Sequence, residues 1–451
     1  MKVILTCLVS ILTMVVANGQ TPVQSYFEWT NLPFTKEELN TRRENLMTEL
    51  AQLNKKGLVL IPAKDGFSFG ETFRQTDDFY YFTGLELPNA ILVFNLNNQK
   101  VTIYTPEQDI RFENSSRKND FPGRPLLYDN SIINRTGIPL ASIEDFTNLL
   151  NLENSNKSKI LINNGRPSEV KFAPNDYIAT YSPVQVLIEA IKKKHTDLSF
   201  ENIYEAIAKV RMIKSENEVK ILKQAANITV KGIKEAAKAI KPGIDERYLE
   251  GVLEGDFKKN GSQRLAFGSI IKSGPNSHWP WRILATHYNR RNHIMQNGDL
   301  VIFDVGCEYV QYVSDIGRTF PVSGKFTNEQ KEILMMETKI ADEIIKFLKP
   351  GITFKDVQKF TNTIIPEHSK KYMQVGLFFG HHLGLSTGDP NLSNAPLKPG
   401  MVFAVEPWYY NHDNNISVFT EDMILITEDG CEVLSSDLPR TPEDLENLMK
   451  S

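Results

Sequence analysis

The chain has 451 residues, of which 41% are hydrophobic and 24% are charged, and its formal net charge is −4. This length suits two or three globular domains, each with a buried core. The chain has no long basic run, so the charge pattern excludes nucleic acid as an expected partner.

The first twenty residues predict a secretory signal peptide. Lys2 is followed by a mostly apolar run that ends near Ala17, and small or polar residues come next. One positive charge, a run too short for a membrane span and small residues are typical of such signals. A buried first strand or helix is the alternative. We therefore expect a secreted or periplasmic protein that has no membrane span once residues 1–20 are removed.

Residues 21–195 predict a small α/β domain that opens with a helix. Thr35 and Glu38 have the spacing of a capping box, which starts a helix through about Leu53. The basic pair Arg42 and Arg43 is expected on the polar face of this helix.

Strands are predicted from bounded apolar runs at 57–62, 90–94 and 101–104. Alternating helices and strands continue to about residue 190, which is typical of an α/β domain. The polar stretch 192–196 predicts a linker.

Residues 196–451 predict a second domain made of two similar halves. A capping box at 215–218 starts a helix that ends before a Pro-Gly pair, and the same pattern starts again at 327–330. After each Pro-Gly, Asp245 or Thr353 can start a further helix. The period of about 110 residues is too long for a solenoid and indicates an internal duplication. One site could therefore form where the halves meet.

Four carboxylates and one imidazole in this domain form a distinctive set: Asp304, Asp315, His381, Glu406 and Glu421. Four carboxylates cannot lie together without a compensating charge, because like charges raise each other's pKa and destabilise the fold. Two divalent cations would supply that charge and would also activate water near neutral pH. Asp304 ends a predicted strand, and a hairpin would bring it beside Asp315.

The contexts of these residues resemble those of the pita-bread metallopeptidases, which include aminopeptidase P, prolidase and methionine aminopeptidase. The stretches are Asp304-Val305-Gly306, Ser314-Asp315-Ile316-Gly317-Arg318, His381-His382-Leu383-Gly384-Leu385, Val405-Glu406-Pro407 and Thr420-Glu421-Asp422. Residues 73–90 resemble the N-terminal domain of aminopeptidase P, which methionine aminopeptidases lack. The resemblance implies an α+β fold, with a duplicated pita-bread catalytic domain after a smaller α/β domain, and a homo-oligomer.

The resemblance also implies roles for the five residues. Asp315 and Glu421 would bridge two metal ions, Asp304 would serve one, and His381 and Glu406 the other. The oxygen-rich ligand set and the resemblance favour manganese, with cobalt or zinc as alternatives. Glu406 would also act as the general base. A further histidine, His287, would face the substrate and stabilise charge during bond cleavage, with the nearby His278 and His293 as alternatives for this role.

The implied activity is release of the first residue from peptides with proline in the second position. A prolidase-type dipeptidase acting on Xaa-Pro is the alternative. Two alternatives come from other functional classes. The protein could be a non-catalytic binding protein with this fold, or it could carry out creatinase-like chemistry.

Three positions depart from the family pattern. The resemblance implies a histidine four residues before His381 and another seven after it, but Leu377 and Gly388 occupy these positions. Phe419 replaces an arginine that often lies two residues before Glu421. His382 adjoins His381 and would replace it as the ligand if the loop shifted by one residue. The metal ligands are therefore expected to be intact, whereas the residues around them are altered.

Overall fold

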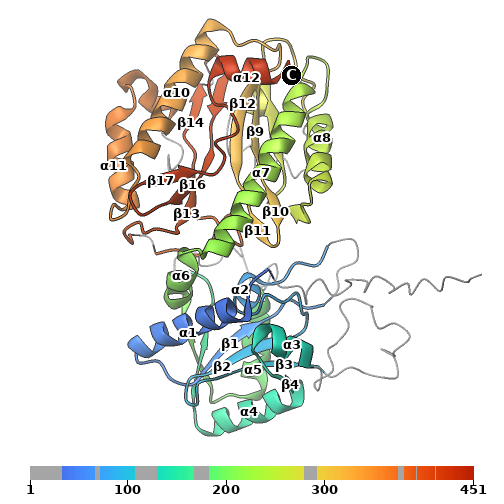
Figure 1. Cartoon of the computed structure of the whole chain (residues 1–451), viewed down its shortest axis with the longest axis vertical. Coiled ribbons are helices and arrows are strands. Elements are labelled where there is room, and N and C mark those ends of the chain that lie inside the picture. The colour runs from blue at the N-terminus through green and yellow to red at the C-terminus, as the bar shows by residue number, and fades with distance from the viewer. Residues whose placement is uncertain are drawn as a thin grey trace, which may run out of the picture.

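The computed structural model describes residues 33–66, 72–106, 130–166, 182–278, 292–373, 380–392, 394–411 and 413–450. It consists of two lobes, with the N-terminal lobe below and the larger C-terminal lobe above in Figure 1. Helix α6 (Tyr204–Met212) and the first turns of α7 (Glu216–Lys238) join them. The predicted signal peptide lies outside the described residues. Among the helices that are described, none is both long and apolar enough to cross a membrane.

The N-terminal lobe is built on one mixed sheet with the strand order β4-β3-β2-β1-β5-β6. The strands are β1 (Leu58–Pro62), β2 (Ile91–Asn95), β3 (Lys100–Thr105), β4 (Leu140–Ser142), β5 (Lys159–Ile162) and β6 (Ser199–Asn202). The first three strands pair antiparallel, and β4, β5 and β6 each join in parallel. Strand β6 lies beyond residue 195, so the sheet continues past the polar stretch that predicted a linker.

Helices cover both faces of this sheet. They are α1 (Lys36–Gln52), α2 (Asp77–Thr83), α3 (Asn130–Thr136), α4 (Ile143–Ser155) and α5 (Pro183–Lys194). Alternate side chains of β1 enter two separate cores: Val59 and Ile61 pack on one side, and Leu58 and Leu60 on the other. Because side chains of a strand alternate between faces, a strand buried on both sides is apolar throughout.

The prediction that Arg42 and Arg43 lie on a polar face is wrong, because both are buried. The Arg42 guanidinium donates to the carbonyl of Tyr81 at 3.0 Å, and the Arg43 guanidinium donates to that of Phe82 at 2.7 Å. Both acceptors belong to α2, so the two arginines satisfy carbonyls at the end of that helix.

Capping at the start of α1 also differs from the prediction. Thr35 accepts a hydrogen bond from the backbone N–H of Glu38. The Glu38 carboxylate does not complete the box; it accepts hydrogen bonds from Ser215 and Asn217 at the start of α7. This carboxylate therefore connects the two lobes.

The C-terminal lobe repeats one order of elements, as predicted. Its first half contains α7, α8 (Glu246–Lys259), β7 (Arg264–Leu265), β8 (Ile270–Ser273), the 3-10 turn Gly274–Asn276, β9 (Leu300–Val305), β10 (Cys307–Tyr309), β11 (Tyr312–Val313) and β12 (Ile316–Pro321). Its second half contains α10 (Asn328–Phe347), α11 (Phe354–Ile364), the 3-10 turn Glu367–Tyr372, β13 (Val402–Val405), β14 (Trp408–Asn411), β15 (Ile416–Phe419), β16 (Asp422–Ile426) and β17 (Cys431–Val433). Helix α12 (Pro442–Leu448) ends the lobe.

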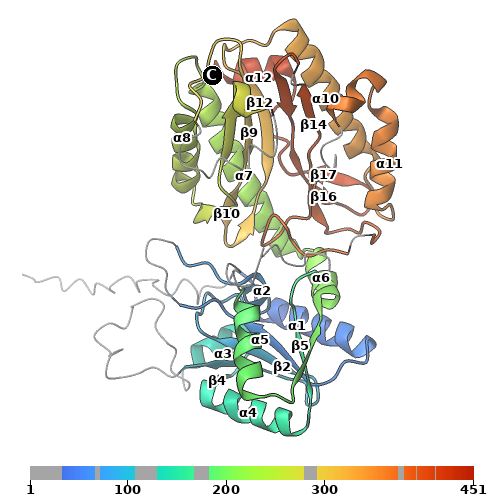
Figure 2. The same ribbon diagram turned by 180° about the vertical axis from the view of Figure 1, so that it is seen from behind.

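Both predicted capping boxes form, at Ser215 of α7 and Thr327 of α10. Asp245 and Thr353 cap the second helix of each half. The strands lie between the helix pairs, with α7 and α8 on one side and α10 and α11 on the other (Figure 2). The predicted α+β class with a duplicated C-terminal domain is confirmed.

Substitution of Arg42 should destabilise the protein. Its guanidinium pairs with Glu38 at 2.8 Å and Glu218 at 3.5 Å, so Arg42→Ala removes the cation that compensates these two carboxylates. It also removes the donor to the Tyr81 carbonyl. Loss of one partner of a buried pair costs about 3–5 kcal/mol, which denaturant unfolding would measure. Asn45→Ala, at an exposed position of the same helix, is the control and should have little effect. Equal stability of the two variants would contradict the burial of Arg42.

Candidate metal centre

Two of the predicted ligands come from the strands of the first half. Asp304 lies near the end of β9, where its register partners are Gly317 of β12 and Ile270 of β8. Asp315 immediately precedes β12. The antiparallel pairing of β9 and β12 therefore returns the chain beside Asp304, as the predicted hairpin requires, with the β10–β11 hairpin inserted at the turn.

The other three ligands come from the second half. His381 accepts a backbone hydrogen bond from Ala404 of β13 at 3.0 Å, and Glu406 directly follows β13. Glu421 precedes β16 and forms an isolated bridge with Gly317, in which each N–H donates to the other carbonyl. This bridge holds strand β12 of one half against the ligand of the other half.

The side chains of Asp315, His381 and Glu421 form the tightest part of the cluster. They offer ligand atoms that all lie within 4.8 Å of one another. His381 Nε2 lies 3.4 Å from Asp315 Oδ2 and 3.9 Å from Glu406 Oε1. Glu406 therefore borders this group, and Asp304 adjoins it closely enough for its charge to raise the pKa of Asp315.

The neighbouring His382 points elsewhere. It is buried against Phe354, with the two rings stacked at 5.0 Å, and its backbone bridges to Phe403. Burial lowers the pKa of His382 to about 3, so the ring is neutral. The structure thus places His381 rather than His382 beside the carboxylates. His287 lies outside the described residues.

The carboxylates carry perturbed pKa values. Burial raises the pKa of Asp304 to about 7. Burial and the charge of Asp304 raise the pKa of Glu406 to about 8. The pKa values of Asp315 and Glu421 are raised well above the ordinary range, first by burial and then by neighbouring carboxylates. The charges of Asp304 and Glu406 act on both groups, and that of Asp315 also acts on Glu421. Each of these groups loses hydration on burial and faces like charges, which disfavours the ionised form.

Several oxygen and nitrogen atoms of the predicted metal ligands have no hydrogen-bond partner within the described part of the chain. Asp315 Oδ1, Glu421 Oε2 and His381 Nδ1 are buried and have no hydrogen bond among the described residues. Buried polar atoms are normally satisfied, so unsatisfied atoms beside crowded carboxylates fit the binding of a cation. Carboxylate oxygens with one imidazole suit a divalent ion of the harder type. The donor set therefore fits a metal centre.

Arg318, whose role the sequence did not reveal, holds the backbone next to the ligand Glu421 in place. Its fully buried guanidinium donates to the carbonyl of Glu421 at 2.7 Å and to Asp422 Oδ1 at 2.7 Å. Thr319 bonds both backbone groups of Phe419 through its hydroxyl. These bonds fix the segment around Glu421 against β12. The only sequence signal was that Arg318 and Thr319 follow Asp315 in the same motif.

Trp408 is a second residue whose role the sequence did not reveal. Its indole N–H donates to Glu406 Oε2 at 3.2 Å. The indole stacks on Phe419 with a ring separation of 3.6 Å and on Tyr410 at 5.5 Å. Phe419 also lies against Gly317, where a Cβ atom would collide with the ring. An aromatic stack therefore occupies the place where the family resemblance implies an arginine.

The position expected to hold a second histidine opens into a cavity. Gly388 lines a cavity of about 640 Å³ between the lobes, together with residues of β1, α2 and α6. A Cβ atom at Gly388 would have no neighbour within 4 Å, so the site has room for a side chain. Leu377 lies outside the described residues.

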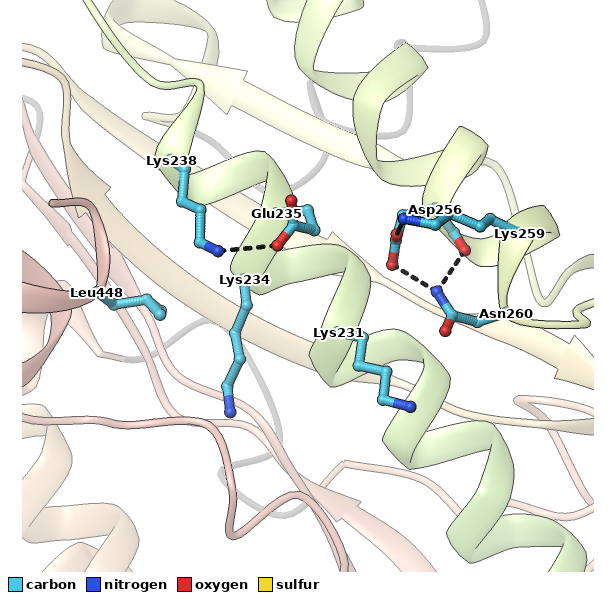
Figure 3. A pocket seen from close by; sticks show the side chains of 8 residues that line it. All are labelled: Lys231, Lys234, Glu235, Lys238, Asp256, Lys259, Asn260 and Leu448. Atoms are coloured by element: carbon cyan, nitrogen blue, oxygen red, sulfur yellow. Dashed lines mark hydrogen bonds and ion pairs between the residues drawn. The ribbon is translucent and has the colours of Figure 1, made fainter. Parts of the chain in front are cut away.

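A smaller cavity of about 350 Å³ lies on the surface between α7, α8 and α12. Lys231, Lys234 and Lys238 project from α7 along it, and Lys238 pairs with Glu235 (Figure 3). None of the five predicted ligands lines this cavity. It is therefore separate from the candidate metal centre.

Comparison with known proteins agrees with this geometry. The profile of metallopeptidase family M24 matches residues 220–428, and the profile of the aminopeptidase P N-terminal domain matches residues 39–114. A Xaa-Pro dipeptidase from Pyrococcus horikoshii is 34% identical over 256 residues, covering 55% of this chain and 69% of the relative. The chain belongs to metallopeptidase family M24. The predicted resemblance to aminopeptidase P is thus confirmed.

Other M24 relatives match nearly the whole chain. A Xaa-Pro aminopeptidase from Escherichia coli is 26% identical over 457 residues, covering 92% of this chain and 98% of the relative. The structure of E. coli aminopeptidase P superposes with a TM-score of 0.74 at 24% identity, over 92% of this chain and 98% of that one. A zinc-substituted form of the same enzyme with product gives a TM-score of 0.72 at 24% identity, over the same shares of the two chains. The shared fold therefore extends over both lobes.

The metal-free protein should lose stability as the pH rises. The folded-state pKa values of Asp304 and Glu406 are about 7 and about 8, above their ordinary values of 3.8 and 4.5. The folded protein holds these protons more tightly than the unfolded chain does. The resulting stability is fully present below the ordinary pKa values and is lost as the pH rises through the folded-state values. Thermal unfolding in chelator should therefore occur at lower temperature toward pH 8, and added Mn²⁺ should remove this decline.

Asp304→Asn supplies the control for this prediction. It removes one titrating group and should make the unfolding temperature of the metal-free protein less dependent on pH. A metal-free protein whose unfolding temperature rises or stays constant over the same pH range would contradict the charge crowding.

The indole N–H of Trp408 should be needed for full peptide hydrolysis. Trp408→Phe keeps an aromatic ring in the stack but removes the donor to Glu406. Hydrogen bonds to charged groups contribute roughly 1.5–3 kcal/mol, so we expect kcat to fall about tenfold. Tyr410→Phe is the matched control, because the Tyr410 hydroxyl is buried and has no hydrogen-bond partner within the described part of the chain. Equal kcat values for both variants would refute the role of the indole.

Proposed function

We propose that the protein is a metallo-aminopeptidase that releases the first residue from peptides with proline in the second position. The observation that carries the proposal is the cluster of Asp315, His381 and Glu421, bordered by Glu406 and Asp304. Membership of family M24 and the match of the aminopeptidase P N-terminal domain support it. The substrate class comes from two relatives, a Xaa-Pro aminopeptidase and a Xaa-Pro dipeptidase.

We further propose that Asp304, Asp315, His381, Glu406 and Glu421 hold two divalent metal ions, with manganese as the first candidate and cobalt or zinc as alternatives. The unsatisfied donor atoms and the crowded carboxylates support a divalent charge at this place. When bound, such ions neutralise the carboxylates, polarise the scissile carbonyl and activate water.

The protein residues then position the substrate and move the proton. Glu406 is the proposed general base because its carboxylate borders the cluster, with Oε1 3.9 Å from His381 Nε2. Trp408 donates to one oxygen of this carboxylate, which leaves Oε1 directed toward His381. The aromatic stack of Trp408, Phe419 and Tyr410 excludes water from one side of the base.

A prolidase-type dipeptidase is the second candidate. The 34% identity over 256 residues to the dipeptidase of Pyrococcus horikoshii favours it. The N-terminal lobe argues for the longer substrate, because its profile is that of the aminopeptidase P N-terminal domain.

Two further proposals concern the setting of the enzyme. The apolar N-terminal run after Lys2 supports secretion or a periplasmic location. The resemblance to aminopeptidase P supports a homo-oligomer.

The test is hydrolysis of an Xaa-Pro-Xaa tripeptide and of the matching Xaa-Pro dipeptide by the full chain loaded with Mn²⁺. We expect release of the first residue from the tripeptide and loss of this activity in chelator. Glu406→Gln should abolish turnover because the amide cannot accept the proton, while the unfolding temperature stays close to that of the wild type.

The outcomes separate the candidates. Cleavage of the dipeptide alone would replace aminopeptidase activity with prolidase activity. Full turnover by Glu406→Gln would refute the role of the base. No hydrolysis of either peptide by the metal-loaded protein would refute the proposed reaction and favour a binding function.

A further inference from the structure

A buried ion network lies where the two lobes meet, and its centre is Asp389. One oxygen of this carboxylate accepts from Arg211 at 2.5 Å, and the other accepts from Lys214 at 3.1 Å. All three side chains are at most 4% exposed. Burial alone would raise the pKa of Asp389, but the charges of Arg211 and Lys214 lower it below the ordinary value. The Asp389 carboxylate therefore has two buried cationic partners.

Asp389 also organises the loop that carries His381. Its backbone N–H donates to the carbonyl of His382 at 3.2 Å, and its Oδ1 accepts from the N–H of Leu385 at 3.2 Å. The carboxylate packs so closely on Gly384 that a Cβ atom there would collide with it. Residues 381–389 thus fold around this one carboxylate, and the predicted metal ligand lies at the start of the loop.

The network continues into the N-terminal lobe. Arg211, near the end of α6, donates to Asp78 at 2.7 Å and to Asp77 at 3.4 Å. Both acids lie in the first turn of α2. One guanidinium therefore joins α2 of the N-terminal lobe to Asp389 of the catalytic loop.

A second connection runs parallel to the first. Arg74 donates to the carbonyl of Leu385 and pairs with Asp77 at 2.8 Å and with Glu308 of β10 at 2.5 Å. The loop after His381 is therefore held against α2 at two points, Leu385 and Asp389. Movement of the lobes would separate buried charges, which is costly in a medium of low dielectric constant.

We propose that Asp78 is a positioning residue for the metal centre: through Arg211 and Asp389 it holds the His381 loop, so the N-terminal lobe sets the metal affinity of the catalytic lobe. This inference rests on the proposed metal centre and deepens it. Residues that orient a metal ligand typically change metal affinity by about 10- to 100-fold when they are substituted. Asp78 is two contacts further away, since it acts through Arg211 and Asp389. We therefore expect a smaller change of about three- to tenfold.

The test is calorimetric titration of the full-length, metal-free protein with Mn²⁺. Asp78→Asn keeps the shape of the side chain but removes its charge, and it should raise the Kd for Mn²⁺ by the stated factor. Glu201→Gln is the matched control, because Glu201 pairs only with Lys55 and Lys159, both in the N-terminal lobe, among the ion pairs of the described residues. The control should leave the Kd unchanged. Thermal unfolding of each metal-free variant reports stability separately.

Asp389→Asn gives a second, independent measurement. If it folds, its Kd should rise by about 10- to 100-fold, because the loop loses its central acceptor. The double variant Asp78→Asn/Asp389→Asn should then bind about as weakly as Asp389→Asn alone, since the two residues act through one chain of contacts. Fully additive effects would overturn the proposed route.

The remaining outcomes distinguish the two proposals. A wild-type protein that does not bind Mn²⁺ would overturn the metal centre and the inference together. A wild-type protein that binds Mn²⁺ with the same Kd as Asp78→Asn would overturn the inference alone and leave the proposed function intact. An equal rise in Kd for Glu201→Gln would show that the effect is general destabilisation and would also overturn the inference.

Discussion

Mutual repulsion among four crowded carboxylates is the constraint on which this structure depends. Asp304, Asp315, Glu406 and Glu421 each lose hydration, and each lies close to another acid, so their pKa values are raised. Such a group is stable only with protons or a cation. The protein backbone must therefore hold the acids in place against a force that separates them. This requirement explains why the four acidic ligands lie in or directly next to strands.

The duplicated architecture meets this requirement by using two rigid halves. Asp304 and Asp315 belong to one half, and Glu421 is joined to it by the reciprocal hydrogen bonds with Gly317. Arg318 adds a buried cation that binds the backbone of Glu421 and the side chain of Asp422. That cation lies directly behind the acidic cluster and neutralises Asp422. Because this cation is paired with Asp422, it adds no net positive charge to the four acids, and that charge is left for a metal ion to supply.

Local signals in the sequence predicted much of this arrangement. Capping boxes at Ser215 and Thr327, strands ending at Asp304 and the order of the five ligands all depend on residues close together in the chain. The polar-face prediction for Arg42 was wrong because its acceptors on α2 are distant in sequence. Arginine is usually exposed, and only the fold reveals that free helix carbonyls lie within its reach.

The residues that hold the metal ligands in place were not predicted either, because their contacts depend on the fold. Trp408 follows Glu406 by two positions, but Glu406 lies after β13 and Trp408 begins β14, so no strand periodicity fixes how their side chains lie. This spacing was compatible with a contact but did not specify an indole donor. Asp389 had even less signal, because its partners Arg211 and Lys214 are more than 170 residues away.

The departures from the family pattern follow from these contacts. Phe419 cannot donate a hydrogen bond as an arginine would, but it stacks on Trp408, whose indole donates to Glu406 instead. The donor to the proposed base is therefore neutral, and an uncharged donor leaves the negative charge of the cluster uncompensated. Such a site needs metal charge more strongly than one with a nearby guanidinium. The positions of the ligands then matter more, and the buried pairing of Asp389 with Arg211 and Lys214 holds the histidine loop where that charge is required.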